Sequence, residues 1–259
     1  MLVTDFSPII EIIEENYEVP HLNATRRISA LLPYDYYESD RRYPVLYLQD
    51  GQNLFNPDAP FGDWAIDRSM ESLASSGLKD IIIIAVDHGK KERIIEYFPY
   101  YNNRFGQGKG RHYVQFMKEK LIPYVNTKYR TLRGFSNTGI GGSSMGGLIS
   151  LYAGLSRPKL FGKMMIFSPS LWTSSKIYEE AYGFKPTRES KIYVYAGGKE
   201  SAHHLPNVKR LTGILKSKTP TYSNFAFKVV INEDGEHSET YWKDEFPKAL
   251  KWLYFNISE

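Results

Sequence analysis

The chain has 259 residues, of which 33 are basic, 29 are acidic and none is cysteine, and its formal net charge at pH 7 is +4. Without cysteine it has no disulfides, no thiol nucleophile and no thiolate metal site. Its charges are scattered without long runs of one sign, which excludes a nucleic-acid-binding arm, and the longest apolar run, at 81–86, is too short to span a bilayer.

Short apolar runs alternate with amphipathic segments along the chain. The first strands, near Tyr17 and Ile28, have no helix between them and are predicted to pair antiparallel at one edge of a sheet. Further strands are predicted at 43–48, 80–86, 138–142, 163–167, 191–196 and 225–231. Helical periodicity is predicted at 65–75, 113–129, 148–155, 207–215 and 241–254.

This alternation predicts βαβ units in a single α/β domain over residues 1–259. We expect a mostly parallel central sheet of about eight strands with helices on both faces. No large cap domain is expected. The long polar segment 88–111 and the aromatic-rich segment 169–190 are expected to be irregular and to roof the crevice.

The strongest chemical signal is Gly-Ser-Ser-Met-Gly at 142–146, between a predicted strand and a predicted helix. A bare Gly-x-Ser-x-Gly pattern also occurs in tight glycine turns. The strand before it and the helix after it are the context of the nucleophile elbow of α/β hydrolases, which exposes a serine at a strained turn. Ser144, not Ser143, has glycine at two-residue spacing on both sides and is the predicted nucleophile.

A serine hydroxyl needs a base to remove its proton. In α/β hydrolases the chain order is nucleophile, acid and then histidine, which follows the last strand. His237 occupies that position. His203 and His204 come too early and are interpreted as surface or helix-cap residues.

The acid that orients the histidine is expected after the strand at 191–196. Glu200 lies there, behind two glycines that let the loop turn sharply. Glu233 and Asp234 stay open as rivals because they are close to His237 in sequence.

An oxyanion hole requires two backbone amides. One is predicted from Met145, the residue after the nucleophile, and the other from Gln52, after the strand at 43–48. Asp50 and Asn53 are interpreted as turn caps without a catalytic role.

With these segments in place, the sequence resembles the esterase family of α/β hydrolases that includes esterase D, enterochelin esterase and feruloyl esterases. The similarity extends from about residue 26 to 253. It rests on the segments 47–55 (YLQDGQNLF), 142–147 (GSSMGG), 167–172 (FSPSLW) and 235–242 (GEHSETYW). The resemblance implies an α/β-hydrolase fold and ester hydrolysis without a cofactor or metal.

The resemblance supports Ser144 and His237 position by position. It supports Glu200 less strongly, because the family uses either Asp or Glu as the acid. It also implies that Leu171 and Trp172 line the substrate cleft, although packing under a loop would explain them equally.

The sequence therefore predicts a serine carboxylesterase that acts on a small-molecule ester through an acyl-enzyme. A siderophore trilactone and feruloyl or acetyl carbohydrate esters stay open as substrates. An acyltransferase with the same triad and a non-catalytic binding protein on this fold are the alternatives from other classes. The segment 1–20 does not resemble a secretory signal, which predicts a cytoplasmic protein without a membrane partner. The oligomeric state, homo-oligomer included, stays open.

Overall fold

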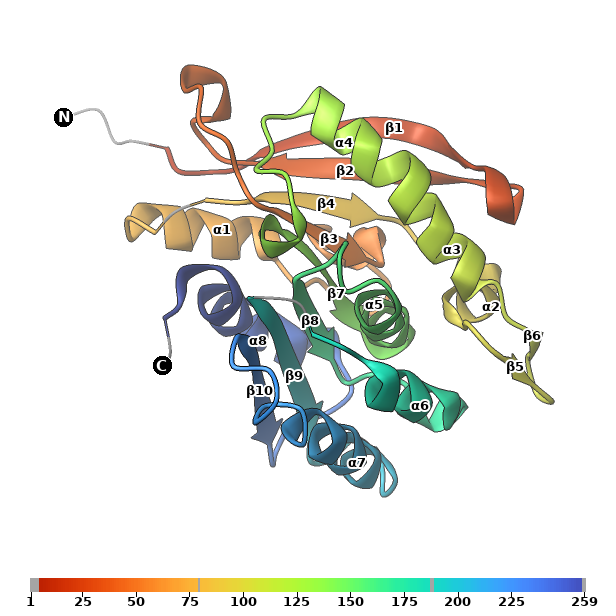
Figure 1. Ribbon diagram of the computed structural model, residues 1–259. Coiled ribbons are helices and arrows are strands. Elements are labelled where there is room, and N and C mark those ends of the chain that lie inside the picture. Colours follow the sequence, from red (N-terminus) through yellow and green to blue (C-terminus); the bar gives the residue numbers. More distant parts are fainter. Residues whose placement is uncertain (1–4, 79, 187–188, 258–259) are drawn as a thin grey trace.

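The computed structural model describes residues 5–78, 80–186 and 189–257, and its main feature is a sheet of eight strands (Figure 1). The strands follow the order β1-β2-β4-β3-β7-β8-β9-β10. Their bounds are β1 (Ile9–Val19), β2 (Ala24–Leu32), β3 (Val45–Gln49), β4 (Ile82–Val86), β7 (Thr138–Ser143), β8 (Lys163–Phe167), β9 (Ser190–Gly197) and β10 (Phe225–Asn232). A separate small hairpin is formed by β5 (Tyr101–Asn102) and β6 (Gly106–Gln107).

The sheet is mixed and mostly parallel. All neighbouring pairs from β4 to β10 are parallel, whereas β2 pairs antiparallel with both β1 and β4. The predictions of a mostly parallel sheet of about eight strands and of an antiparallel edge are both confirmed. Because the parallel strands share one direction, the loops that follow them meet at one edge of the sheet.

Helices cover both faces of the sheet, as predicted (Figure 1). Successive strand residues point to opposite faces, so Val45 and Tyr47 of β3 join one core and Leu46 and Leu48 join the other. The helices are α1 (Ile66–Ser75), α2 (Arg93–Tyr97), α3 (Gly110–Phe116), α4 (Ile122–Lys128), α5 (Ser144–Ser156), α6 (Lys176–Gly183), α7 (His204–Lys216) and α8 (Glu239–Leu250).

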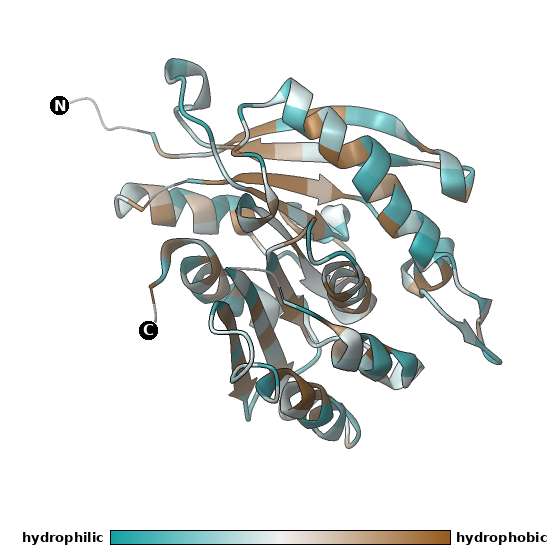
Figure 2. Cartoon of the chain, viewed as in Figure 1, coloured by the Kyte–Doolittle hydropathy of each residue, from teal (hydrophilic) through white to brown (hydrophobic). Residues whose placement is uncertain are grey.

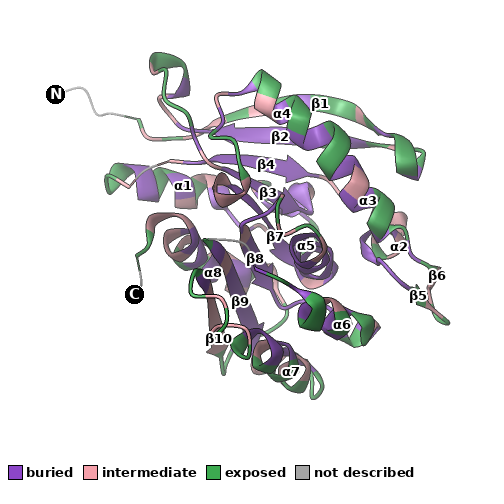
Figure 3. Ribbon diagram, in the orientation of Figure 1, coloured by how far each residue is buried: buried purple, intermediate pink, exposed green. Residues whose placement is uncertain are grey.

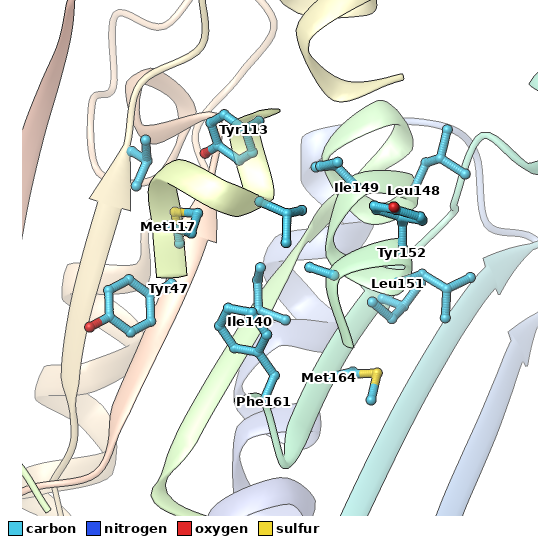
Figure 4. Packing of buried hydrophobic residues seen from close by; sticks show 14 of the residues in the cluster. Tyr47, Tyr113, Met117, Ile140, Leu148, Ile149, Leu151, Tyr152, Phe161 and Met164 are labelled. Atoms are coloured by element: carbon cyan, nitrogen blue, oxygen red, sulfur yellow. The ribbon is translucent and has the colours of Figure 1, made fainter. Parts of the chain in front are cut away.

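The two cores differ in their helices. Residues of α1 and α8 pack on one face, and residues of α3 to α7 pack on the other. Figure 4 shows the second core, where Tyr47 and Ile140 of the sheet lie near Met117 and Leu148 of the covering helices. The inner strands are largely hydrophobic in Figure 2 and buried in Figure 3, whereas the edge strand β1 is largely exposed and β10 is intermediate. The outer sides of α4, α6 and α7 are exposed. No helix within the described ranges is long and apolar enough to cross a membrane.

Two segments predicted to be irregular contain regular structure. The segment 88–111 includes α2 and the β5–β6 hairpin, and the segment 169–190 includes α6. Each of these helices buries a few residues in the core, such as Tyr97 at the end of α2 and Ile177 in α6. They are too short for a periodic hydrophobic pattern to reveal them, because helical periodicity needs a window of about 11–18 residues.

Candidate active site

The predicted elbow is a sharp turn between β7 and α5. Ser144 has φ 56°, in the left-handed region that L-residues seldom occupy, and its Oγ lies 3.3 Å from Ser170 Oγ. Both flanking glycines are sterically required: a Cβ on Gly142 would lie 3.0 Å from the Gly146 carbonyl carbon, and one on Gly146 would lie 2.6 Å from Asp50 Oδ2. The sequence thus builds the strained turn by removing two side chains.

The structure brings His237 and Glu200 together from different loops at the carboxyl edge of the sheet. His237 lies between β10 and α8, Glu200 lies between β9 and α7, and His237 Nδ1 is 2.7 Å from Glu200 Oε2. His237 and Ser144 line the same cavity of about 430 Å³. A nucleophile candidate and a base candidate therefore face one space, with a carboxylate behind the base.

The Glu200 side chain is only 3 % exposed and is surrounded by donors. Its Oε1 accepts hydrogen bonds from the Ser168 hydroxyl at 2.5 Å and from the Gly197 amide at 2.7 Å. Burial alone would raise the pKa of Glu200, but the hydrogen bonds from His237, Ser168 and Gly197 together lower it below its usual value. The carboxylate is thus kept ionised beside His237.

Trp242, in α8, supports this arrangement from behind. Its indole Nε1 donates to Ser168 Oγ at 2.9 Å, and its ring packs edge-on against the His237 ring with centroids 5.0 Å apart. The sequence pattern did not reveal Ser168 or Trp242 as part of the site. Trp242 occupies the first turns of the helix after His237, which is the one local signal for it.

His204 is a second histidine at Glu200. Its side chain is buried, and Nε2 lies 3.3 Å from Glu200 Oε2 without the geometry of a hydrogen bond. Burial lowers the pKa of His204 below its usual value, against the attraction of Glu200. Of the two interpretations, surface or helix-cap, the surface one is therefore wrong for His204, which begins α7, whereas His203 is exposed at the N-cap position of that helix.

The rival acids lie elsewhere. Asp234 is exposed and forms an ion pair with Lys199 at 2.7 Å, and Glu233 is also exposed. His237 pairs with Glu200 and not with its sequence neighbours, because the turn after β10 directs their side chains to solvent.

The two predicted oxyanion residues lie in backbone that suits the task. Met145 is the second residue of α5, so its amide is among the first four that have no acceptor within the helix. Gln52 lies in a 3-10 turn, Gly51–Asn53, directly after β3. The Gln52 side chain donates to the His88 carbonyl at 3.1 Å and accepts from the His88 amide at 3.0 Å, which anchors the turn to the loop after β4.

Asp50 directly precedes this turn, but its side chain makes no capping hydrogen bond, so its interpretation as a turn cap is wrong. The residue is buried, has φ 59° and holds Arg93 of α2 in a two-pronged ion pair, with Nε to Oδ1 at 2.6 Å and a terminal nitrogen to Oδ2 at 2.8 Å. The two residues are 43 positions apart, and no local pattern in the sequence links them.

Leu171 and Trp172 follow Ser170, the neighbour of Ser144. Leu171 is buried in the core, and Trp172 is 57 % exposed beside Phe105. Both line a separate hollow of about 310 Å³ together with His204. Neither residue lines the Ser144 cavity, so their expected place in the substrate cleft stays a prediction.

The Ser144 cavity has both charged and apolar walls. Phe61 and Ile94 supply apolar surface, and the charged or titratable side chains that line it are Asp50, His88, Lys90, Lys91, Arg93, His237 and Glu239. Among the described residues, no group of three or more His, Cys, Asp and Glu side chains has the arrangement of a metal site.

Comparisons with known proteins concern the family and the fold of the chain. A family model described as "Putative esterase" matches residues 20–253. The chain is 26 % identical to the protein YbbA of Bacillus subtilis over 247 residues, which covers 90 % of this chain and 94 % of that protein.

Solved structures with a similar fold include an IroE-like serine hydrolase from Shewanella oneidensis, with a TM-score of 0.76, 17 % identity, and coverage of 97 % of this chain and 81 % of that chain. The enterobactin esterase FES from Shigella flexneri, solved in the presence of enterobactin, has a TM-score of 0.72 and 20 % identity. That similarity covers 98 % of this chain and 60 % of the Shigella chain. At these identities the structural similarity concerns the fold.

Proposed function

The chain belongs to this esterase family, and on that premise we propose that it hydrolyses carboxylic esters through an acyl-enzyme on Ser144. His237 is the proposed general base and Glu200 the acid that orients it. The observation that carries the proposal is the pair His237–Glu200, at 2.7 Å, beside a cavity that Ser144 also lines from a strained elbow.

In the proposed mechanism the His237 Nδ1–H donates to Glu200, which leaves Nε2 as the proton acceptor. As Ser144 Oγ attacks the ester carbonyl carbon, its proton moves to Nε2 and the carbonyl oxygen becomes negative. The amides of Met145 and Gln52 hold that oxygen, and the start of α5 adds a favourable dipole.

The tetrahedral intermediate then collapses. The bond between the carbonyl carbon and the alkoxy oxygen breaks, and the His237 Nε2–H gives its proton to the departing alcohol. Water repeats the sequence on the acyl-enzyme, with His237 again as the base, and releases the carboxylic acid and free Ser144.

The proposed natural substrates to test first are a catecholate trilactone and feruloyl esters. Proteins of similar fold include an enterobactin esterase and a ferulic acid esterase. Acetyl, butyryl and octanoyl p-nitrophenyl esters complete the panel. Product analysis in the presence of an added alcohol separates hydrolysis from acyl transfer.

The test of the proposal combines turnover with labelling. The wild-type protein is expected to hydrolyse p-nitrophenyl acetate and to react with a fluorophosphonate probe at Ser144. The variant Ser144→Ala is expected to lose both, while the neighbouring variant Ser143→Ala still carries the label on Ser144. Undiminished hydrolysis by Ser144→Ala, or a label on another residue, would overturn the assignment.

A further inference from the structure

A buried carboxylate lies against the predicted oxyanion hole. Asp50 directly precedes the Gly51–Asn53 turn that carries the Gln52 amide. Its Oδ2 occupies the place beside Gly146 where a Cβ would come within 2.6 Å, two residues after Ser144 in the first turn of α5. The carboxylate therefore lies close to Gly146 in α5, while the backbone of Asp50 leads into the turn that carries Gln52.

Such a carboxylate would oppose the reaction if its charge were uncompensated. The oxyanion is a new negative charge formed in a partly buried site, where charges interact more strongly than in water. The dipole of α5 stabilises the oxyanion near the start of the helix. An unpaired Asp50 carboxylate at the same place would reduce that stabilisation.

Arg93 supplies the compensation. Its guanidinium reaches from α2 and binds both oxygens of Asp50, at 2.6 and 2.8 Å. Burial alone would lower the pKa of Arg93, but the adjacent Asp50 raises it above its usual value, so the cation persists throughout the working pH range. The guanidinium also lies 5.5 Å from the centroid of the Tyr97 ring, which holds it from the other side.

We propose that Arg93 is a positioning residue that fixes the oxyanion turn through Asp50 and cancels the charge of that carboxylate. This rests on the proposed function. Asp50 tolerates the left-handed backbone that starts the turn, and its carboxylate ties the turn to α2. Because Arg93 binds both carboxylate oxygens, the ion pair has no net charge that would repel the oxyanion.

Substitutions of Arg93 alone, and of Arg93 together with Asp50, test this role. Arg93→Gln leaves Asp50 negative and unpaired, and we expect kcat for p-nitrophenyl acetate to fall by roughly 10- to 100-fold. KM should change by less than about threefold, because Arg93 touches the developing oxyanion only through Asp50. Arg93→Lys retains the charge and should remain closer to the wild type.

Removing the carboxylate as well should restore part of the activity. The double variant Asp50→Asn/Arg93→Gln is expected to have a kcat about three- to tenfold above that of Arg93→Gln, because no uncompensated charge remains, and to stay below the wild type, because the anchor of the turn is lost. An ion pair with a purely structural role gives the opposite result, a double variant no better than Arg93→Gln. Thermal unfolding of each variant shows whether a lost activity comes from a lost fold.

The outcomes are separable. If the double variant is no more active than folded Arg93→Gln, the inference is wrong, and Ser144→Ala still decides the proposed function independently. If Arg93→Gln mainly raises KM and Asp50→Asn does not rescue it, Arg93 binds substrate directly and the inference is again wrong. The neutral substrate removes any direct attraction between Arg93 and a charged ester.

Discussion

Two buried carboxylates flank Ser144, and they differ in the partner that each one holds. Glu200 binds His237, which takes up and gives back a proton in the proposed mechanism, and Asp50 binds Arg93, which stays charged. In the proposed mechanism Glu200 therefore acts on a group that changes charge during the reaction, whereas Asp50 is a neutralised anchor. The same functional group has two roles because the surrounding donors differ.

The largest expected effect on kcat comes from replacing Glu200. In Glu200→Gln the amide can donate to His237 Nδ1 and favour the wrong tautomer, so kcat should fall by about 10³- to 10⁴-fold. Steady-state kinetics with p-nitrophenyl acetate measures this. Asp234→Asn is the control: this exposed carboxylate pairs with Lys199, and its variant should match the wild type. Retention of more than about a tenth of the activity by Glu200→Gln would contradict the role of Glu200.

A second, smaller effect acts on the Asp50 side. A Cβ in Gly146→Ala would meet Asp50 Oδ2 at 2.6 Å and push the carboxylate or the helix start aside. We expect kcat to fall about 100-fold, as when one oxyanion donor is misplaced.

Gly213→Ala in α7 is the matched control, since nothing lies within 4 Å of its Cβ position. That variant should keep its activity, and its free energy of unfolding should rise by about 0.5–1 kcal/mol. Wild-type kinetics for Gly146→Ala would show that the close approach to Asp50 is dispensable.

A milder substitution tests the residues that support Glu200. Trp242→Phe removes the donor to Ser168 Oγ but keeps a ring against His237. Glu200 retains its bonds from His237, Ser168 and Gly197, so kcat should fall only about two- to tenfold, the value of one ordinary hydrogen bond. A kcat as low as that of Glu200→Gln, together with a displaced His237 ring in a crystal structure of the variant, would mean that Trp242 holds the histidine directly.

The smallest expected effect concerns stability in acid. The folded-state pKa of Glu200 is lowered, so its contribution to the free energy of unfolding is fully present above the unfolded value near 4.5 and is lost as pH falls through the lower folded value. Urea unfolding of the wild type and Glu200→Gln at several pH values measures it. The difference between the two free energies should shrink below about pH 4.5, and a constant difference down to pH 3 would contradict this linkage.

The sequence predicts the frame of the molecule well. Long strands and helices have strong periodic patterns, and the elbow is marked by glycines at positions 142 and 146, where a Cβ would be crowded by neighbouring atoms. The order of Ser144, Glu200 and His237 follows from the order of the strands that carry them. These features depend on residues that are close in the sequence.

What the sequence did not reveal depends on contacts between distant segments. Arg93 meets Asp50 across 43 positions, and Trp242 meets Ser168 across 74. Nothing in the local pattern of either segment indicates its partner. His204 was misjudged for a related reason: its burial arises from packing around Glu200, and a histidine in the first turn of a helix carries no local sign of that.

The most direct test of the central claim is to trap the acyl-enzyme. Wild-type protein mixed with p-nitrophenyl acetate, quenched in acid within the first turnovers and digested should carry one acetyl group on the peptide that contains Ser144. Ser144→Ala treated in the same way should carry none. Ester turnover without an acetylated Ser144, or acetylation of a different residue, would contradict the mechanism.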